Sequence, residues 1–321
     1  MISLLIPCYN ESEVLRTTYA ALVRVAQRWS EPVEFVFVDD GSQDDTWRTI
    51  EQLGSVDSRV KGARLSRNFG HQAAIGAGLE RVTGDAVIVM DADLQDPPEL
   101  IDSMLDKWRA GYDVVYAQRN CRLGESVFKR VTGHIFYRML ERFQEVPIPR
   151  DVGDFALMDA RIVRLMLGFQ EHAIFWRGLR CWAGFRHTAV RFDRPPRAAG
   201  KTKYSLTKLA KLASDGLLSF SPLPLRLALY LGAATCFATL LTFVIAVSMY
   251  LATAGQTTIV SASVLVTAFM GSVQLMCIGL LGEYVNRIYT DVRGRPRWIV
   301  QSTLGIGEAE SGLTVPRRRA G

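Results

Sequence analysis

The 321-residue sequence has few of the residues that cysteine- and histidine-based sites require. Its five cysteines show neither the spacing of a zinc site nor that of a disulfide framework. The four histidines, at positions 71, 134, 172 and 187, are scattered along the chain, so nothing supports a zinc enzyme or a Ser/His/Asp triad. Cysteines without a pairing pattern are typical of a protein in a reducing compartment.

A second absence concerns charge. Residues 227–282 contain no Asp, Glu, Lys or Arg. A helix needs about 20 apolar residues to cross a membrane, and a polar turn at residues 254–258 divides this stretch in two. The pattern predicts a two-helix transmembrane hairpin over residues 225–288. A buried helical hairpin in a soluble domain is the alternative, and it is disfavoured because soluble helices of this length rarely lack charge on every face.

Basic residues flank the uncharged stretch on both sides, whereas its central turn has no charge. The positive-inside rule then predicts a multi-pass protein of the inner (cytoplasmic) membrane, with the catalytic domain and both termini in the cytoplasm. Residues 205–224 are predicted to be an amphipathic juxtamembrane segment, which either lies at the interface or caps the domain. Residues 289–321 are predicted to be a cytoplasmic tail.

The formal net charge of +6 gathers near this stretch, and no nucleic-acid-binding motif accompanies it. Anionic membrane lipids and a lipid phosphate are therefore the expected partners, and nucleic acid is not.

Residues 1–204 are predicted to form an α/β domain. Apolar runs at residues 2–6, 33–38, 60–65 and 86–90 indicate strands, with helical patterns between them. This alternation implies a Rossmann-like, mostly parallel sheet. A polar loop follows each of the four strands, and a doubly wound sheet places such loops along one rim, where they can enclose a nucleotide.

The fourth of these strands ends in Asp91-Ala92-Asp93. Residues i and i+2 of an extended chain point the same way, so the two carboxylates can aim at one point on the rim. Paired oxygen ligands suit Mg²⁺ or Mn²⁺, which complete their coordination with substrate phosphates. Gln95 is a third candidate ligand. The alternative is a solvated acidic turn that caps the helix starting near Pro97.

Three motifs resemble the signatures of family 2 glycosyltransferases with the GT-A fold: residues 7–11 (PCYNE), 38–42 (VDDGS) and 91–97 (DADLQDP). Residues 152–155, 197–204, 282–285 and 295–296 extend the match to the polyprenyl-phosphate glycosyltransferases. Within them the sequence is most similar to bactoprenol glucosyltransferases, and it is more distantly similar to dolichol-phosphate mannose synthases. The resemblance covers about residues 1–300.

The resemblance implies an inverting hexosyltransferase that moves a sugar from a nucleotide sugar to polyprenyl (undecaprenyl or decaprenyl) phosphate for cell-envelope glycosylation. UDP-glucose is the first donor expected. A divalent ion would stabilise the charge of the leaving nucleoside diphosphate. A homo-oligomer, as a tetramer, is also implied. The implied donor-binding residues are Pro7, Tyr9, Glu11, Asp40, Arg67 and Asn68; for Pro7 and Tyr9, ordinary turn packing is the alternative.

The expected acceptor needs charge compensation more than deprotonation. The second pKa of a phosphate monoester is about 6, so the lipid phosphate is mostly dianionic at pH 7. Arg and Lys bind phosphate through charge-assisted hydrogen bonds. The candidates are Arg119, Lys129, Arg130, Arg197 and Lys201, with a solvated basic face as the alternative.

Asp154 resembles the acceptor-side carboxylate of the bactoprenol enzymes. It could act as a base, orient an arginine or contact a sugar hydroxyl, and a purely structural aspartate is the alternative. Because a phosphate acceptor needs no base, orientation is the favoured role. The candidate catalytic residues are therefore Asp91, Asp93, Asp154 and Arg197.

Rival functions remain open. A processive polysaccharide synthase would share the nucleotide-binding half, but residues 177–182 (RGLRCW) miss the Gln-x-x-Arg-Trp motif of such enzymes by one insertion. A catalytically dead membrane scaffold is disfavoured by the intact Asp91/Asp93 pair. A flippase is disfavoured because only two membrane spans are predicted.

Overall fold

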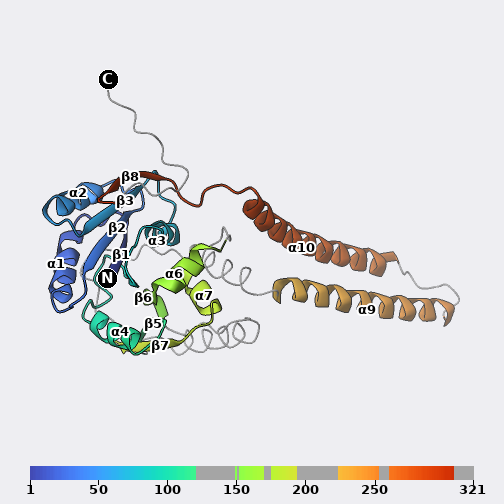
Figure 1. The fold of residues 1–321 in the computed structure, drawn as a ribbon. Coiled ribbons are helices and arrows are strands. Elements are labelled where there is room, and N and C mark those ends of the chain that lie inside the picture. Colours follow the sequence, from blue (N-terminus) through green and yellow to red (C-terminus); the bar gives the residue numbers. More distant parts are fainter. Residues whose placement is uncertain (121–148, 150–151, 170–174, 194–222, 253–259, 307–321) are drawn as a thin grey trace, which may run out of the picture. The chain divides into compact units, whose positions relative to one another are not determined.

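The computed structural model describes residues 1–120, 149, 152–169, 175–193, 223–252 and 260–306 (Figure 1). The chain divides into two compact units. The first comprises residues 1–141, 146–204 and 296–321, and the second comprises residues 142–145 and 205–295.

An eight-stranded sheet in the order β7-β5-β6-β4-β1-β2-β3-β8 forms the centre of the first unit. Strands β3, β2, β1 and β4 pair in parallel, as do β5 and β7, whereas β6 and β8 run antiparallel to their neighbours. The predicted α/β fold with a mostly parallel sheet is confirmed. The strands are β1 (Ile2–Cys8), β2 (Val33–Asp39), β3 (Val60–Leu65), β4 (Ala86–Val89), β5 (Val114–Arg119), β6 (Val152–Asp159), β7 (His187–Phe192) and β8 (Val300–Leu304).

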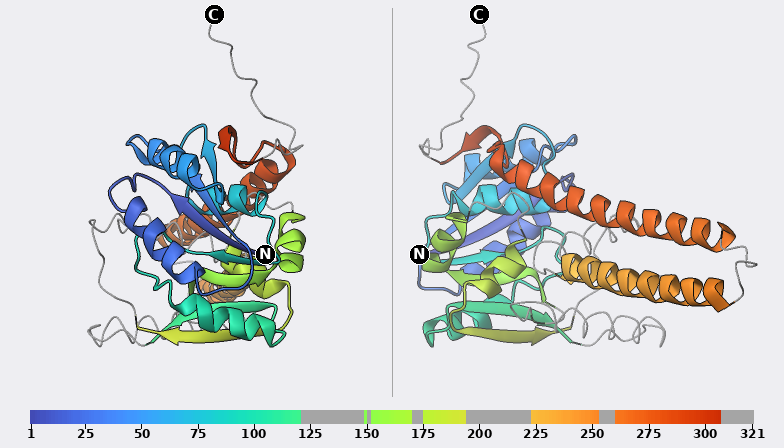
Figure 2. Two further views of the ribbon diagram at one scale, coloured as in Figure 1. Left: turned by 60° about the vertical axis from the view of Figure 1, so that its left-hand side comes forward. Right: turned by 90° about the vertical axis from the view of Figure 1, so that its right-hand side faces the viewer.

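Helices cover both faces of the sheet (Figure 2). One hydrophobic core lies under α1, α2 and α4, and a second lies under α3, α6 and α7. Because side chains alternate between the faces of a strand, Leu4 of β1 belongs to the first core and Leu5 to the second. The helices are α1 (Leu15–Ala26), α2 (Thr46–Val56), α3 (His71–Leu79), α4 (Leu100–Arg109), α6 (Ala160–Leu167) and α7 (Trp176–Trp182).

The strand order creates a switch point between β1 and β4. From β1 the chain continues to β2 and β3 on one side, and it then returns to place β4 on the other side. Ligands of open α/β sheets bind at the carboxyl ends of the strands at such a point. The antiparallel β6 lies next to β4, with Val89 opposite Ala156. The residues that start β6 therefore lie at the same rim as the residues that follow β4.

The sequence predicts a tail over residues 289–321, but residues Val300–Leu304 form the edge strand β8. It pairs antiparallel with β3, and Ser66 N–H donates to the Ile299 carbonyl at 2.9 Å just beyond the pairing. The five residues of this strand, VQSTL, are too few and too polar to stand out as a strand in the sequence.

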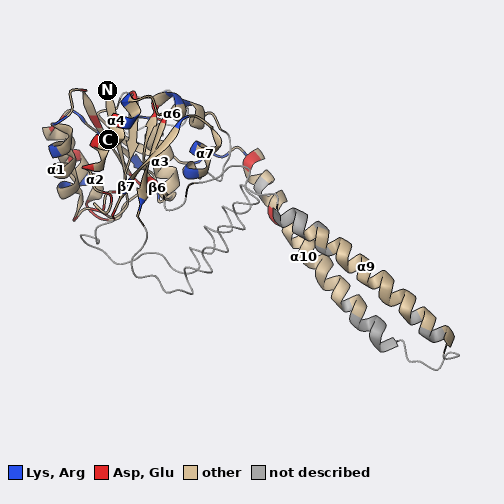
Figure 3. Cartoon of the chain, turned by 90° about the horizontal axis from the view of Figure 1, so that it is seen from below, with Lys and Arg blue, Asp and Glu red and all other residues tan. Residues whose placement is uncertain are grey.

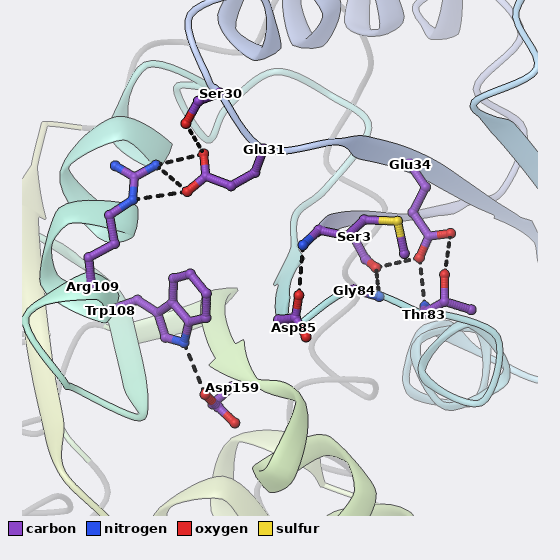
Figure 4. Close-up of polar contacts among 11 residues, drawn as sticks. Ser3, Ser30, Glu31, Glu34, Thr83, Gly84, Asp85, Trp108, Arg109 and Asp159 are labelled. Carbon is purple, nitrogen blue, oxygen red and sulfur yellow. Dashed lines mark hydrogen bonds and ion pairs between the residues drawn. The ribbon is translucent and has the colours of Figure 1, made fainter.

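The buried carboxylate of Glu34 stabilises the rim of the sheet at which the parallel strands begin (Figure 4). Glu34 of β2 is 3 % exposed and accepts hydrogen bonds from the Ser3 hydroxyl, from Thr83 N–H at 2.6 Å and from the Thr83 hydroxyl at 2.9 Å. Lys61 forms an ion pair with it, and Ser3 Oγ accepts from Gly84 N–H at 2.8 Å. These contacts join β1 and β2 to the turn that precedes β4.

We expect Glu34→Ala to lower the free energy of unfolding by about 3 kcal/mol, because it leaves Lys61 and several buried donors without their acceptor. Urea denaturation measures this change. Glu31→Ala is the matched control, since Glu31 pairs with the half-exposed Arg109 at 2.8 Å (Figure 4). Its expected cost is below about 1 kcal/mol. Equal costs for the two variants would contradict the structural role of Glu34.

The second unit contains two long helices, α9 (Leu223–Ala252) and α10 (Val260–Val292). They lie antiparallel, because Thr239 Oγ1 lies 3.3 Å from Met270 Sδ while Cys277 Sγ lies 3.9 Å from the Ala228 carbonyl oxygen. Most of their described length carries no charged side chain (Figure 3).

Within the described ranges, no helix combines the length and apolar character needed to cross a membrane. The transmembrane hairpin therefore stays a prediction. The predicted amphipathic segment lies outside the described residues except for its last two positions.

Candidate active site

The loops after β1 and β2 are hydrogen-bonded to each other at the carboxyl rim. Asn10 N–H donates to Ser42 Oγ at 2.9 Å, and Glu11 N–H donates to Thr46 Oγ1 at 2.9 Å. Asn10 has a φ of +54°, a left-handed conformation that asparagine tolerates better than most residues. The resulting turn places the partly buried Tyr9 and Glu11, two predicted donor-binding residues, next to the loop that follows β2.

Asp40 holds the loop that follows β3. It is 3 % exposed, and its two carboxylate oxygens accept Phe69 N–H at 2.8 Å and Gly70 N–H at 3.0 Å. Gly70 has a φ of +102°, which favours glycine, and the chain turns there into α3. The predicted donor-binding residue Asp40 thus also fixes where α3 begins. Arg67 and Asn68 are exposed on this loop, as their predicted role at the donor would require.

Three ionisable side chains converge where β4 ends and β6 begins. Asp91 follows β4, Asp154 lies near the start of β6, and His71 is the first residue of α3. His71 Nε2 lies 3.3 Å from Asp154 Oδ2 and 3.6 Å from Asp91 Oδ1. The structure therefore brings the predicted metal-side and acceptor-side carboxylates together.

Asp154 is held as an anion. Its side chain is 8 % exposed, and Arg177 of α7 donates from Nε to Oδ1 at 2.9 Å and from Nη2 to Oδ2 at 3.0 Å. Burial alone would raise the pKa of Asp154, but the hydrogen bond from His71 and the charge of Arg177 outweigh it and hold the pKa well below its usual range. A carboxylate bound in this way is a poor general base at neutral pH.

Negative charge is crowded at Asp91. Burial is the main cause that raises its pKa; His71 opposes the rise, and the charges of Asp154 and Asp93 add to it. Burial lowers the pKa of His71, but its hydrogen bond to Asp154 and the charge of Asp91 outweigh burial and raise the pKa to about 8. A divalent cation bound at Asp91 would relieve this crowding.

The residues after β4 fit a hard divalent cation. The sequence predicts an extended chain over Asp91–Asp93, but Ala92 and Asp93 form a turn. This turn therefore sets the directions of the Asp91 and Asp93 carboxylates. Gln95 N–H donates to Asp93 Oδ1 at 3.1 Å. Gln95 Oε1 is buried, and within the described part of the chain it has no hydrogen-bond partner. Two carboxylates and an amide oxygen are the ligand types that Mg²⁺ and Mn²⁺ prefer.

Additional ligands would have to come from elsewhere. Among the residues that the structure describes, no group of three or more His, Cys, Asp or Glu side chains is arranged to hold a metal ion. An ion at Asp91 and Asp93 would therefore need further oxygen ligands, and a nucleotide diphosphate supplies them.

Arg119 is the one predicted acceptor residue within the described ranges. It ends β5, and its Nη2 lies 3.8 Å from Oδ1 of the buried Asp96. A Cβ at Gly153 would lie 3.4 Å from the same Nη2, so Arg119 neighbours the residue that precedes Asp154. The other predicted acceptor residues, Lys129, Arg130, Arg197 and Lys201, lie outside the described residues.

His71, Gln72 and Arg177 were not assigned to the site from the sequence. Gln72 Nε2 donates to Asp154 Oδ2 at 3.2 Å, in addition to the contacts of His71 and Arg177. A signal existed for His71 and Gln72, because they start the helix after the third strand and therefore lie on the predicted rim. No comparable signal existed for Arg177, since its position depends on how α7 packs.

The sequence matches Glycosyl transferase family 2 over residues 3–166. The chain belongs to this family. It is 43 % identical over 304 residues to the "Uncharacterized glycosyltransferase YkcC" of Bacillus subtilis (strain 168), covering 95 % of this chain and 94 % of that protein. It is 38 % identical over 304 residues to the "Bactoprenol glucosyl transferase" of Shigella phage SfX, covering 94 % of this chain and 99 % of that protein.

Among solved structures, the mannosyltransferase PcManGT from Pyrobaculum calidifontis, in complex with GDP-Man and Mn²⁺, is 17 % identical with a TM-score of 0.45. The match covers 90 % of this chain and 87 % of that one. The family match, the curated relatives and the mostly parallel sheet identify the protein as a glycosyltransferase with a GT-A-like α/β fold, as the sequence motifs predict.

A double-mutant cycle tests the pairing of Arg177 with Asp154. We expect Arg177→Gln and Asp154→Asn to be non-additive in thermal unfolding, with a coupling energy of about 1–3 kcal/mol, because each single variant leaves a partner unpaired. The control cycle uses Arg28 and Asp102, which lie 3.1 Å apart with side chains 56 % and 36 % exposed. Its coupling should stay below about 1 kcal/mol. Coupling no larger in the first cycle than in the second would contradict the proposed fixation of Asp154.

Proposed function

We propose that this glycosyltransferase transfers one sugar, with inversion, from a nucleotide sugar to a polyprenyl phosphate, and that the first donor to test is UDP-glucose. The observation that carries the proposal is the fixation of Asp154 by Arg177 and His71. A sugar-hydroxyl acceptor would need a general base on this side of the site. A phosphate acceptor is already ionised at pH 7 and needs none.

The relatives support the same acceptor class. The Shigella phage SfX protein, which aligns with this chain over 99 % of its own length, is named for bactoprenol and glucose. On this basis the product would be a lipid-linked sugar that serves as a donor for cell-envelope glycosylation.

The donor would bind at the switch point between β1 and β4. Asp91, Asp93 and Gln95 would hold Mg²⁺ or Mn²⁺, which supplies positive charge to the leaving nucleoside diphosphate. Tyr9 lies on the same rim, directly after the neighbouring strand β1. There it would bind the nucleoside together with the other predicted donor residues, Pro7, Glu11, Asp40, Arg67 and Asn68.

Arg119 would hold the acceptor phosphate together with the predicted residues Lys129, Arg130, Arg197 and Lys201. A phosphate oxygen then forms the bond to the anomeric carbon while the bond from that carbon to the diphosphate breaks on the opposite face. This displacement inverts the anomeric centre and moves no proton. Asp154 would orient Arg177 and His71 next to the reacting groups.

We also propose that α9 and α10 anchor the enzyme in the cytoplasmic membrane, with both termini on the cytoplasmic side and with assembly into a homo-oligomer. The location rests on the uncharged residues 227–282 and on their basic flanks. In addition, Phe237, Leu240 and Phe243 on α9 are 60–70 % exposed. Exposed apolar surface of this kind is typical of membrane or protein interaction sites. The homo-oligomer, as a tetramer, rests on the family resemblance alone.

Radiolabelled nucleotide sugars, each supplied with undecaprenyl phosphate and the purified full-length protein, test the proposal. Labelled product that extracts into organic solvent, with UDP-glucose as the preferred donor, is the expected result. A long water-soluble polymer would instead indicate a processive synthase. No product from any donor would indicate a scaffold and contradict the transfer reaction.

We expect Asp93→Asn to reduce turnover by at least about 100-fold, because it removes one charged ligand of the ion that stabilises the leaving group. EDTA should abolish transfer, and added Mg²⁺ or Mn²⁺ should restore it. Asp106→Asn, on the exposed face of α4, is the control and should leave turnover unchanged. Full activity in EDTA would contradict the proposed role of a divalent ion in transfer.

The pH profile of Asp154→Asn separates steering from base catalysis. The rate should rise with pH through about 6 as the acceptor phosphate loses its second proton. Because the pKa of Asp154 lies well below its usual range, this carboxylate is already ionised there and should not produce the acidic limb. The variant should therefore be slower but keep the limb. Loss of the limb, with residual activity still measurable, would identify Asp154 as the titrating base.

A further inference from the structure

Two glycines of α3, Gly76 and Gly78, allow neighbouring side chains to approach the helix closely on two opposite faces. A Cβ at Gly78 would lie 2.1 Å from Cδ1 of Leu5 on β1, so any larger residue there would displace this buried side chain or the helix. A Cβ at Gly76 would lie 2.5 Å from Cη2 of Trp298 and 2.9 Å from Cζ2 of Trp176. Residues two apart lie on opposite faces of a helix. α3 is therefore wedged between the sheet and a pair of tryptophans.

Trp298 belongs to the segment that follows α10. Its Nε1 donates to Oε2 of Glu80, directly after the last residue of α3, at 3.2 Å. The next residue, Ile299, accepts Ser66 N–H at 2.9 Å and so fixes the start of the loop that leads into α3. Arg297 donates to the Phe169 carbonyl between α6 and α7. This short segment thus contacts the loop that leads into α3, the residue that follows α3, and Phe169 after α6.

Trp176 connects the tryptophan pair to the site. Its backbone N–H donates to Gln72 Oε1 at 3.1 Å, and its indole Nε1 donates to the Gln72 carbonyl at 2.8 Å. Gln72 in turn donates to Asp154. The first turn of α3, which also carries His71, is therefore bonded both to α7 and to the acceptor-side carboxylate.

We propose that Trp298 is a positioning residue for sugar transfer: by packing on Gly76, beside Trp176, it keeps α3 and α7 at the spacing that holds His71 and Gln72 against Asp154. The reaction concerned is the one under Proposed function. The inference goes beyond that function because it gives the chain after the two long helices a part in the geometry of the active site. A purely structural role, in which this segment only covers the edge of β3, is the competing explanation.

Kinetics of the full-length enzyme separate the two explanations. We expect Trp298→Ala to lower kcat for transfer by about 10- to 100-fold, since small displacements of reacting groups have effects of this size. The KM for the nucleotide sugar should change less than threefold, because the contacts described for Trp298, with Gly76 and Glu80, involve none of the predicted donor residues. Trp298→Phe, which keeps a ring on Gly76, should retain most of kcat.

Leu304→Ala is the matched control. Leu304 lies on the same segment but packs on Gly54 of α2 and on the other hydrophobic core. We expect Leu304→Ala, like Trp298→Ala, to lower the melting temperature, but to leave kcat near that of the parent protein. Equal losses of kcat in Trp298→Ala and Leu304→Ala would overturn the proposal.

Hydrogen exchange gives a second readout that needs no activity. The amides of Ala73 and Ala74 donate to the Gly70 carbonyl in the first turn of α3. They should exchange faster in Trp298→Ala than in the parent or in Leu304→Ala. Unchanged protection in Trp298→Ala would also overturn the proposal. If the parent protein transfers no sugar to a lipid phosphate, the proposed function fails, and the exchange data still decide whether Trp298 positions α3.

Discussion

The antiparallel pairing of β6 with β4 is the constraint on which the candidate active site depends. In a wholly parallel sheet, the strand next to β4 would begin at the far edge and would bring Asp154 there. Because β6 runs the other way, its first residues meet the last residues of β4, and Asp154 lies beside Asp91. One reversed strand thus places a second carboxylate, which the parallel strands do not supply, beside the Asp91 carboxylate at the predicted nucleotide-binding rim.

The charges gathered there constrain the chemistry. The charges of Asp93 and Asp154 both raise the pKa of Asp91, and His71 and Arg177 oppose this rise only in part. Asp154 takes most of this compensation, through two bonds from Arg177. The pKa of Asp91 is raised, mainly by burial, and a bound cation would favour its charged form. The two carboxylates therefore differ in environment, and the difference suits one for a metal and the other for orientation.

Much of the first unit was predictable because it depends on local patterns. The alternation of strands and helices over residues 1–119 and the position of Asp91 at a strand end follow from hydrophobic periodicity and loop polarity. The contact of His71 with Asp154 was not predictable, since it depends on the register of β6, which lies far along the chain from α3. The turn at Asp93 was not predictable, because Leu94 has a φ of +57° and no glycine marks this conformation in the sequence. The strand β8 was not predictable either, because its pairing partner β3 lies far away along the chain.

The glycines of α3 bear directly on how the helix is held. Gly76 and Gly78 both lie inside this helix. In a helix, however, each glycine costs about 1 kcal/mol relative to alanine, so α3 has low intrinsic stability and depends on its contacts. Those contacts come from Leu5 on one side and from Trp176 and Trp298 on the other. The first residues of α3 are those that touch Asp154. The packing on the outer face of α3 can therefore affect the site through the first turn of the helix, as the proposed role of Trp298 requires.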